Sequence, residues 1–158
     1  MSDLGGARRL VRGYRYADFA PGRRFDHATR RTIDRSDSLL FSATTLSLCP
    51  LYFDAEAARA GGHPDLVVNP YFVLALVVGL SVEDLSEHSE AFLGIGEAQF
   101  TRDVYPGDTL RAESLVESRR ESASRPGFGV VTWRTTGFNQ REEAVLRLSR
   151  ANLFEVPR

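Results

Sequence analysis

The second half of the chain alternates between strand-length runs and turn sequences. The runs are rich in β-branched and aromatic residues, and the turns between them contain Pro, Gly, Asp, Asn and Ser. The runs span residues 91–102, 109–120, 127–138 and 143–156. Four consecutive strands joined by short turns predict an antiparallel sheet.

A continuous apolar stretch before these strands predicts one long helix. Asn69 is a favoured N-cap residue, and Pro70 fits the first turn because its missing N–H has no helical partner there. We expect the helix to run to about Val82. Apolar residues occupy every side of it between positions 71 and 78, which is typical of a helix buried all round. The apolar run 66–80 is too short to cross a bilayer.

Two shorter helices are expected upstream. N-cap residue types cluster at Asp34, Ser36 and Asp37, so a helix is expected to begin near them and to run to about Thr45. Asp54 predicts the start of a second helix over residues 55–60, which ends at two consecutive glycines.

The N-terminal part contains a tail and a strand-like segment. Residues 1–13 are small, polar and Arg-rich, and we expect a mobile tail there, followed by a single domain over residues 14–158. The tail has no apolar run, so the sequence predicts no secretory signal. Residues 23–33 mix polar and apolar positions in the manner of a strand.

Charge and composition narrow the function. The formal net charge is −1 and the pI is near 6.3, so no basic field favours nucleic acid or an anionic membrane as a partner. All 20 basic residues are arginine. The absence of lysine excludes a lysine Schiff base and hence covalent pyridoxal phosphate chemistry. Arginine suits the phosphates of a nucleotide carrier, and Arg102, Arg111 and Arg119 are candidates for such contacts or for ion pairs.

Cysteine and histidine usage argues against metals. Cys49 is the only cysteine, so no intrachain disulfide can form and a reducing cytoplasm is expected. The three histidines have no carboxylates at ligand spacing, and we expect neither a metal nor a cofactor. His27 and His88 are interpreted as surface residues without a role.

Several motifs together resemble the MaoC-like hydratases and dehydratases of the hotdog fold, and in particular the mesaconyl-CoA hydratase branch. The resemblance covers the chain from Tyr16 onward. It is carried by Tyr16-x-Asp18-Phe19-x-x-Gly22 before Phe25-x-His27, by residues 74–81, by the turn 104–110, by the hairpin at Ser124-Arg125-Pro126 and by residues 136–140. The resemblance implies an α+β hotdog domain, in which a curved antiparallel sheet wraps one long helix.

The resemblance also implies where the chemistry lies. Members of this family hydrate or dehydrate acyl thioesters with an acid or amide and a histidine that flank a Pro-Leu pair. Here the pair is Pro50-Leu51, the acid position is Ser47 and the histidine position is Tyr52. A backbone N–H at the start of the long helix binds the thioester oxygen in this family, and Tyr71 N–H takes that place because Pro70 has none.

Other residues can replace the missing pair. His63 lies in the loop before the long helix, and Asp65 is a candidate to orient it. We therefore assign Tyr52, Ser47 and His63 as catalytic candidates. Asn69, Tyr71 and Cys49 are substrate-binding candidates, with a capping role for Asn69 and a packing role for Cys49 as the alternatives.

Two function classes stay open. The first is a hydro-lyase on an enoyl or 3-hydroxyacyl thioester of coenzyme A or a carrier protein. The second is a hotdog homologue that has lost hydration and acts as a binding or partner subunit or as a repurposed enzyme. Glu56, Glu83 and Asp84, interpreted as surface charges, keep a thioesterase as a minor alternative. The resemblance and the need to cover sheet edges favour a homodimer, or a heterodimer with an intact homologue.

Overall fold

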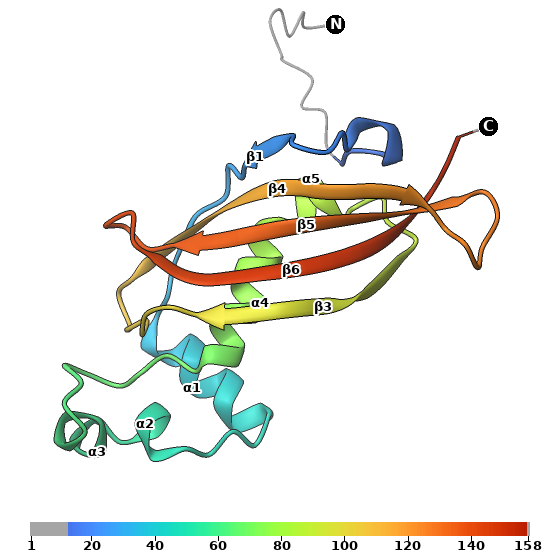
Figure 1. Ribbon diagram of the computed structural model, residues 1–158. Helices are drawn as coiled ribbons and strands as arrows, with labels where there is room; N and C mark the ends of the chain where they lie inside the picture. Colours follow the sequence, from blue (N-terminus) through green and yellow to red (C-terminus); the bar gives the residue numbers. More distant parts are fainter. Residues whose placement is uncertain (1–12, 158) are drawn as a thin grey trace, which may run out of the picture.

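The computed structural model describes residues 13–157, and its main element is the antiparallel sheet predicted from the turn sequences (Figure 1). Each boundary lies within two residues of the sequence prediction. The long strands are β3 (Ala91–Phe100), β4 (Thr109–Glu121), β5 (Phe128–Phe138) and β6 (Ala144–Glu155). The predicted tail lies outside the described residues except for Gly13, whose N–H donates to Glu83 O at 3.1 Å.

Two short strands extend the sheet beyond β4. Both β1 (Arg24–Asp26) and β2 (Arg31–Thr32) pair with β4, and the order along the sheet is β1-β4-β5-β6-β3. The strand-like segment expected at residues 23–33 is therefore broken, because residues 27–30 leave the ladder. β3 forms the edge opposite β1, so the chain crosses the end of the sheet between β3 and β4.

Aspartate caps start the first helices. In α1 (Arg35–Thr44), Asp34 Oδ1 accepts from Ser36 N at 2.8 Å while Asp37 Oδ2 accepts from Asp34 N at 3.0 Å. Asp54 caps α3 (Ala55–Ala60) through the N–H groups of residues 56 and 57. Between them lies α2 (Pro50–Phe53), a four-residue helix that the sequence analysis did not predict. A short 3₁₀ turn, η1, spans Tyr16–Asp18.

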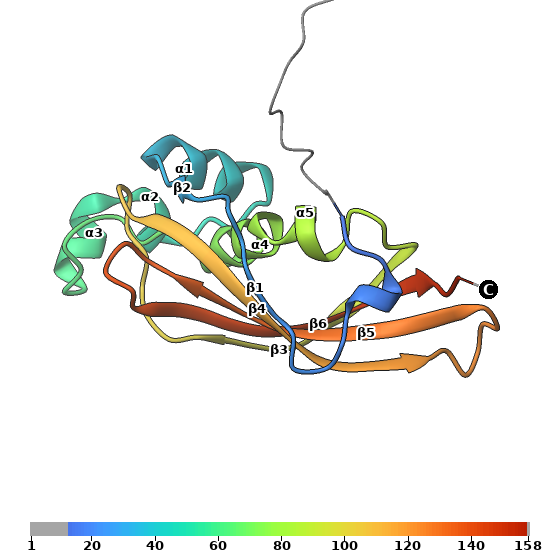
Figure 2. The same cartoon turned by 90° about the horizontal axis from the view of Figure 1, so that it is seen from above.

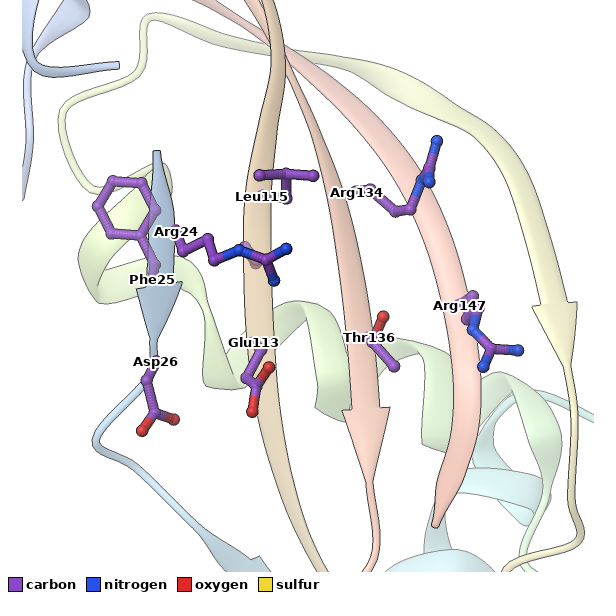
Figure 3. Close-up of a pocket in the computed structure, with 9 residues that line it drawn as sticks. Arg24, Phe25, Asp26, Glu113, Leu115, Arg134, Thr136 and Arg147 are labelled. Carbon is purple, nitrogen blue, oxygen red and sulfur yellow. The ribbon is translucent and has the colours of Figure 1, made fainter. Parts of the chain in front are cut away.

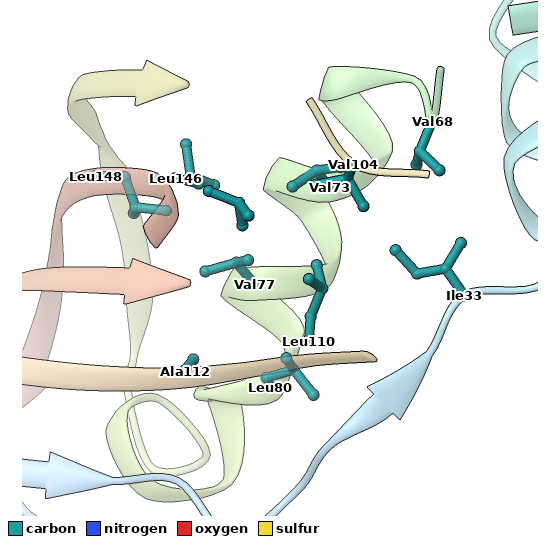
Figure 4. Packing of buried hydrophobic residues seen from close by; sticks show 11 residues of the cluster. Ile33, Val68, Val73, Val77, Leu80, Val104, Leu110, Ala112, Leu146 and Leu148 are labelled. Carbon is teal, nitrogen blue, oxygen red and sulfur yellow. The ribbon is translucent and has the colours of Figure 1, made fainter. Parts of the chain in front are cut away.

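The long helix α4 (Pro70–Leu80) and its short continuation α5 (Val82–Leu85) lie on one face of the sheet (Figures 1 and 2). No helix within residues 13–157 is long and apolar enough to cross a membrane. Aliphatic side chains fill the space between α4 and the strands (Figure 4). The buried members of this core are Ile33, Val68, Val73, Val77, Leu80, Val104, Leu110, Ala112, Val145, Leu146 and Leu148.

The expectation that α4 is buried all round is wrong. Only Val73, Val77 and Leu80 are buried, whereas Tyr71 is 62% exposed and the other apolar side chains are exposed or half-buried. The reason is geometric, because one sheet covers only one side of the helix. Edge strand β3 also exposes large apolar side chains, namely Phe92, Leu93, Ile95 and Phe100.

Candidate functional site

A pocket of about 140 Å³ opens between α2, the start of α4 and the segment that follows β3. Its polar lining consists of Tyr52, His63, Arg102 and Asp103. The remaining walls are apolar and come from Leu51, Val67, Val68, Pro70, Val73, Phe100 and Val104. An apolar slot with a few polar groups at one side suits an acyl chain whose reacting end is polar.

A larger cavity, of about 520 Å³, lies on the outer face of the sheet, away from α4 (Figure 3). Its walls carry charged side chains of both signs, among them Arg24, Asp26, Glu113 and Arg147. No residue that the sequence analysis singled out for the site lines this cavity. The smaller pocket is the better candidate, because it contains two of the predicted catalytic residues and an apolar wall.

Tyr52 lies in α2, which begins at Pro50 after the N-cap residue Cys49. Burial raises the pKa of the Tyr52 phenol, and the nearby Cys49, Tyr71 and Asp103 raise it further. The hydroxyl therefore stays protonated near neutral pH and can act as a hydrogen-bond donor rather than as a base.

His63 reaches the same pocket from the loop between α3 and α4. Its Nδ1 lies 3.1 Å from the hydroxyl of Tyr105 and 3.6 Å from Asp103 Oδ2. Asp65, the expected partner, instead accepts from Arg35 Nη2 at 2.5 Å and from Leu66 N at 2.8 Å. The prediction for Asp65 is wrong because its carboxylate accepts from Leu66 N and pairs with Arg35 of α1 instead of contacting the imidazole.

Asp103 and Tyr105 lie beside His63 although no sequence motif predicts them as site residues. Both belong to the segment between β3 and β4, forty or more positions after His63. The turn signal at residues 104–110 located the segment but carried no information about its neighbours in space. Arg102, a candidate for carrier contacts, lines the pocket, while Arg111 pairs with Glu113 and Glu142 and Arg119 donates to backbone carbonyls.

Ser47 and Cys49 lie beside the pocket on the connection between α1 and α2. Both are half-buried, and neither belongs to the pocket lining. Ser47 N donates to Ser42 O at 2.9 Å, and Ser47 O accepts from Cys49 N at 3.0 Å. The backbone of this connection thus fixes Ser47 near α2 without bringing it together with Tyr52 and His63.

Asn69 is fully buried, and both ends of its side-chain amide make internal hydrogen bonds. Its Oδ1 accepts from Tyr71 N at 2.9 Å, and its Nδ2 donates to Ser42 Oγ at 2.9 Å. Phe72 N and Val73 N both donate to Asn69 O. Asn69 thus caps α4, and Tyr71 N–H is engaged with the cap rather than open to the pocket.

The interpretation of His27 as a surface residue is wrong. His27 is only 2% exposed, and its Nδ1 lies 2.6 Å from Asp84 Oδ2 and its Nε2 2.8 Å from Ser114 Oγ. Ser114 Oγ in turn contacts Thr135 Oγ1 at 2.8 Å. Burial lowers the pKa of His27 more than Asp84 raises it. This network lies outside the Tyr52 pocket, whereas His88 is exposed as expected.

Known proteins resemble the chain over nearly its whole length. The family model for mesaconyl-CoA hydratase matches residues 3–158. A mesaconyl-CoA hydratase of Haloarcula hispanica is 33% identical over 148 residues, which cover 93% of this chain and 41% of the relative. The chain spans about two-fifths of the length of such curated relatives.

Solved structures agree with this match. A protein of Chloroflexus aurantiacus described as a MaoC domain dehydratase has a TM-score of 0.89 at 30% identity, with 96% of this chain and 43% of that chain covered. A Mycobacterium tuberculosis protein described as having a double hotdog fold has a TM-score of 0.83 at 23% identity, covering 92% and 45%. The chain has the hotdog fold and belongs to the mesaconyl-CoA hydratase family of MaoC-like proteins.

Proposed function

We propose that this chain is a hydro-lyase that acts on an enoyl or 3-hydroxyacyl thioester of coenzyme A or of a carrier protein. The observation that carries the proposal is the pocket beside the family's motif position, where a phenol and an imidazole face an apolar slot. The names of the relatives, hydratases of mesaconyl-CoA, favour a branched dicarboxylic acyl group as the substrate.

In the hydration direction, His63 Nε2 accepts a proton from water while the water oxygen bonds to the β-carbon of the enoyl group. The electrons of the carbon–carbon double bond move toward the thioester oxygen, where negative charge develops. The Tyr52 hydroxyl donates a hydrogen bond to that oxygen. Protonated His63 then returns the proton to the α-carbon, so that one water is added and no other reactant is consumed.

The remaining candidates keep supporting roles in this proposal. Ser47 and Cys49 lie on the connection between α1 and α2, where Cys49 O accepts from Tyr52 N at 2.9 Å. Tyr71 N–H donates to Asn69 Oδ1 at 2.9 Å. It can bind the thioester oxygen only if that hydrogen bond to Asn69 is broken. These assignments stay predictions, as does the cytoplasmic location.

A substrate panel tests the proposal. The purified chain is incubated with 2-enoyl-CoA and 3-hydroxyacyl-CoA thioesters, including mesaconyl-CoA, and enoyl absorbance and product mass are followed beside an intact MaoC-like hydratase. We expect turnover, with the highest rate on a branched dicarboxylic thioester. No turnover of any thioester in the panel, while the control enzyme is active, would contradict the hydro-lyase assignment for the chain alone.

A second function is favoured by a separate observation. The exposed side of α4 and the apolar edge strand β3 leave surface for a second hotdog unit, and curated relatives are more than twice as long as this chain. A partner that carries the intact acid and histidine would make this chain a binding subunit. Turnover that appears only when such a homologue is added would support this second function over the first.

A further inference from the structure

The segment between β3 and β4 presents two side chains to His63 from a rigid support. Tyr105 N donates to Asp108 Oδ2 at 2.9 Å, and Asp108 N donates back to Tyr105 O at 3.0 Å. Val68 N donates to Val104 O at 2.8 Å, which ties the segment to the chain entering α4. The backbone of residues 104 and 105 is therefore held at the pocket, and the neighbouring Asp103 side chain is 55% exposed.

His63 is held just as firmly from the other side. Its backbone N–H donates to Ala58 O at 3.0 Å, directly after Gly62, whose φ of +90° is a conformation that L side chains rarely adopt. The side chain is 24% exposed. The ring thus lies between the end of α3 and the segment after β3.

The two ring nitrogens of His63 have different surroundings. Nδ1 faces the Tyr105 hydroxyl at 3.1 Å and Asp103 Oδ2 at 3.6 Å. No residue within 13–157 hydrogen-bonds Nε2, and the imidazole lines the pocket. A carboxylate beside one imidazole nitrogen favours the proton on that nitrogen, and the lone pair then lies on the other.

We propose that Asp103 and Tyr105 are positioning residues that hold neutral His63 in its Nδ1–H tautomer, with the Nε2 lone pair directed into the pocket. Tyr105 oxygen accepts from Nδ1–H, and the Asp103 carboxylate stabilises the same tautomer and the imidazolium that forms when Nε2 takes a proton. This inference rests on the proposed function, in which His63 is the proton acceptor. It explains how a loop histidine can replace the motif histidine of the family.

The other charged and titratable groups around the ring are Tyr105, Asp108 and Arg102. Burial raises the pKa of the Tyr105 phenol, and Asp103 and Asp108 raise it further, so this hydroxyl stays protonated at neutral pH. Arg102 also lines the pocket, but its Nη2 lies 3.5 Å from Glu143 Oε1. Within residues 13–157, Asp103 is the carboxylate paired with the imidazole, with Oδ2 at 3.6 Å from Nδ1.

Nuclear magnetic resonance of the full chain labelled with 15N-histidine reads the tautomer directly. At a pH where the rings are neutral, two-bond proton–nitrogen correlations distinguish Nδ1–H from Nε2–H, and His63→Gln identifies the His63 signal. We expect Nδ1–H in the unmodified protein and a shift toward Nε2–H in Asp103→Ala. Asp26→Ala, which removes a carboxylate from the outer face of the sheet, is the matched control and should leave the His63 signal unchanged.

Two results would overturn the proposal: Nε2–H in the unmodified protein, or the same tautomer with and without the Asp103 carboxylate. Because the signal needs no turnover, its outcome is separate from the outcome of the substrate panel. Where turnover is found, Asp103→Ala should lower kcat about 10- to 100-fold with little change in KM, and Asp103→Glu should restore part of it. A loss confined to KM would contradict a positioning role.

Discussion

Two histidines in this chain have opposite environments, and their residue-scale roles follow from the difference. His63 lies at a pocket with one nitrogen engaged, whereas His27 is buried with both nitrogens bonded. The sequence pointed to His63 because it precedes the long helix. It gave no sign that His27 is buried, since that burial depends on tertiary contacts with Asp84 of α5 and Ser114 of β4. The partners Asp103 and Tyr105 were missed for the same reason.

His27 predicts how stability depends on pH. Burial, with a smaller contribution from Arg150, lowers its pKa in the fold more than Asp84 and Asp26 raise it, so the unfolded chain binds more protons between the folded pKa and about pH 6.5. The stabilisation that neutral His27 contributes is therefore fully present above pH 6.5 and is lost as the pH falls from 6.5 toward the folded pKa. We expect the midpoint temperature of thermal unfolding, measured by circular dichroism, to be lower at pH 5.5 than at pH 7.5.

The control for this pH effect is His27→Gln. It should be less stable at pH 7.5 because it breaks the bonds to Asp84 and Ser114, and its unfolding midpoint should depend less on pH over the same range. If the unfolding midpoint changes equally with pH in the unmodified chain and in His27→Gln, other groups cause the pH dependence.

At the scale of secondary-structure elements, helix α4 packs closely against strand β5 at Gly137. A Cβ built on Gly137 would lie 2.5 Å from Val77 Cγ2 at the centre of the core. The absence of a side chain at this strand position therefore sets how closely the helix packs on the sheet.

Gly137→Ala should lower the free energy of unfolding by about 1–3 kcal/mol, because the added methyl group overfills a packed core. Gly79→Ala is the matched control on α4, where a Cβ would meet nothing within 4 Å. That substitution should be neutral or stabilising by up to about 1 kcal/mol through helix propensity. Urea unfolding of both variants and of the unmodified chain measures these changes. Equal changes in the free energy of unfolding for Gly137→Ala and Gly79→Ala would contradict the prediction.

Elements with strong local signals could be predicted from the sequence, and elements defined by their surroundings could not. Turn residues marked the ends of the four long strands, and Asp34, Asp54 and Asn69 marked the starts of α1, α3 and α4. α2 was missed because four residues carry little periodicity. The apolar sequence of α4 was interpreted as burial within the monomer, although an interface helix has the same composition.

At the scale of the whole molecule, apolar side chains on α4 and β3 are left exposed. α4 shows apolar side chains on the side away from the sheet, and β3 is an unpaired edge with 55% of Phe92 exposed. We propose that a second hotdog unit covers this surface, supplied by another copy of the chain.

Phe92→Glu should reduce self-association, because a charge on the edge strand opposes pairing with a second strand. Ser124→Glu, at the exposed turn between β4 and β5, introduces the same charge away from this edge and is the control. Sedimentation velocity should show a dimer for the unmodified chain and the control, and a monomer for Phe92→Glu. A monomer in every case would contradict the homodimer.

In the proposed function, Tyr52 and His63 carry out water addition in place of the family's acid and histidine. The most direct measurement compares the rate of water addition to mesaconyl-CoA by the unmodified chain, Tyr52→Phe, His63→Gln and the surface control His88→Gln. We expect the rate to fall by about 10²- to 10⁴-fold in Tyr52→Phe and in His63→Gln and to stay unchanged in His88→Gln. Turnover that survives in both Tyr52→Phe and His63→Gln would contradict this function.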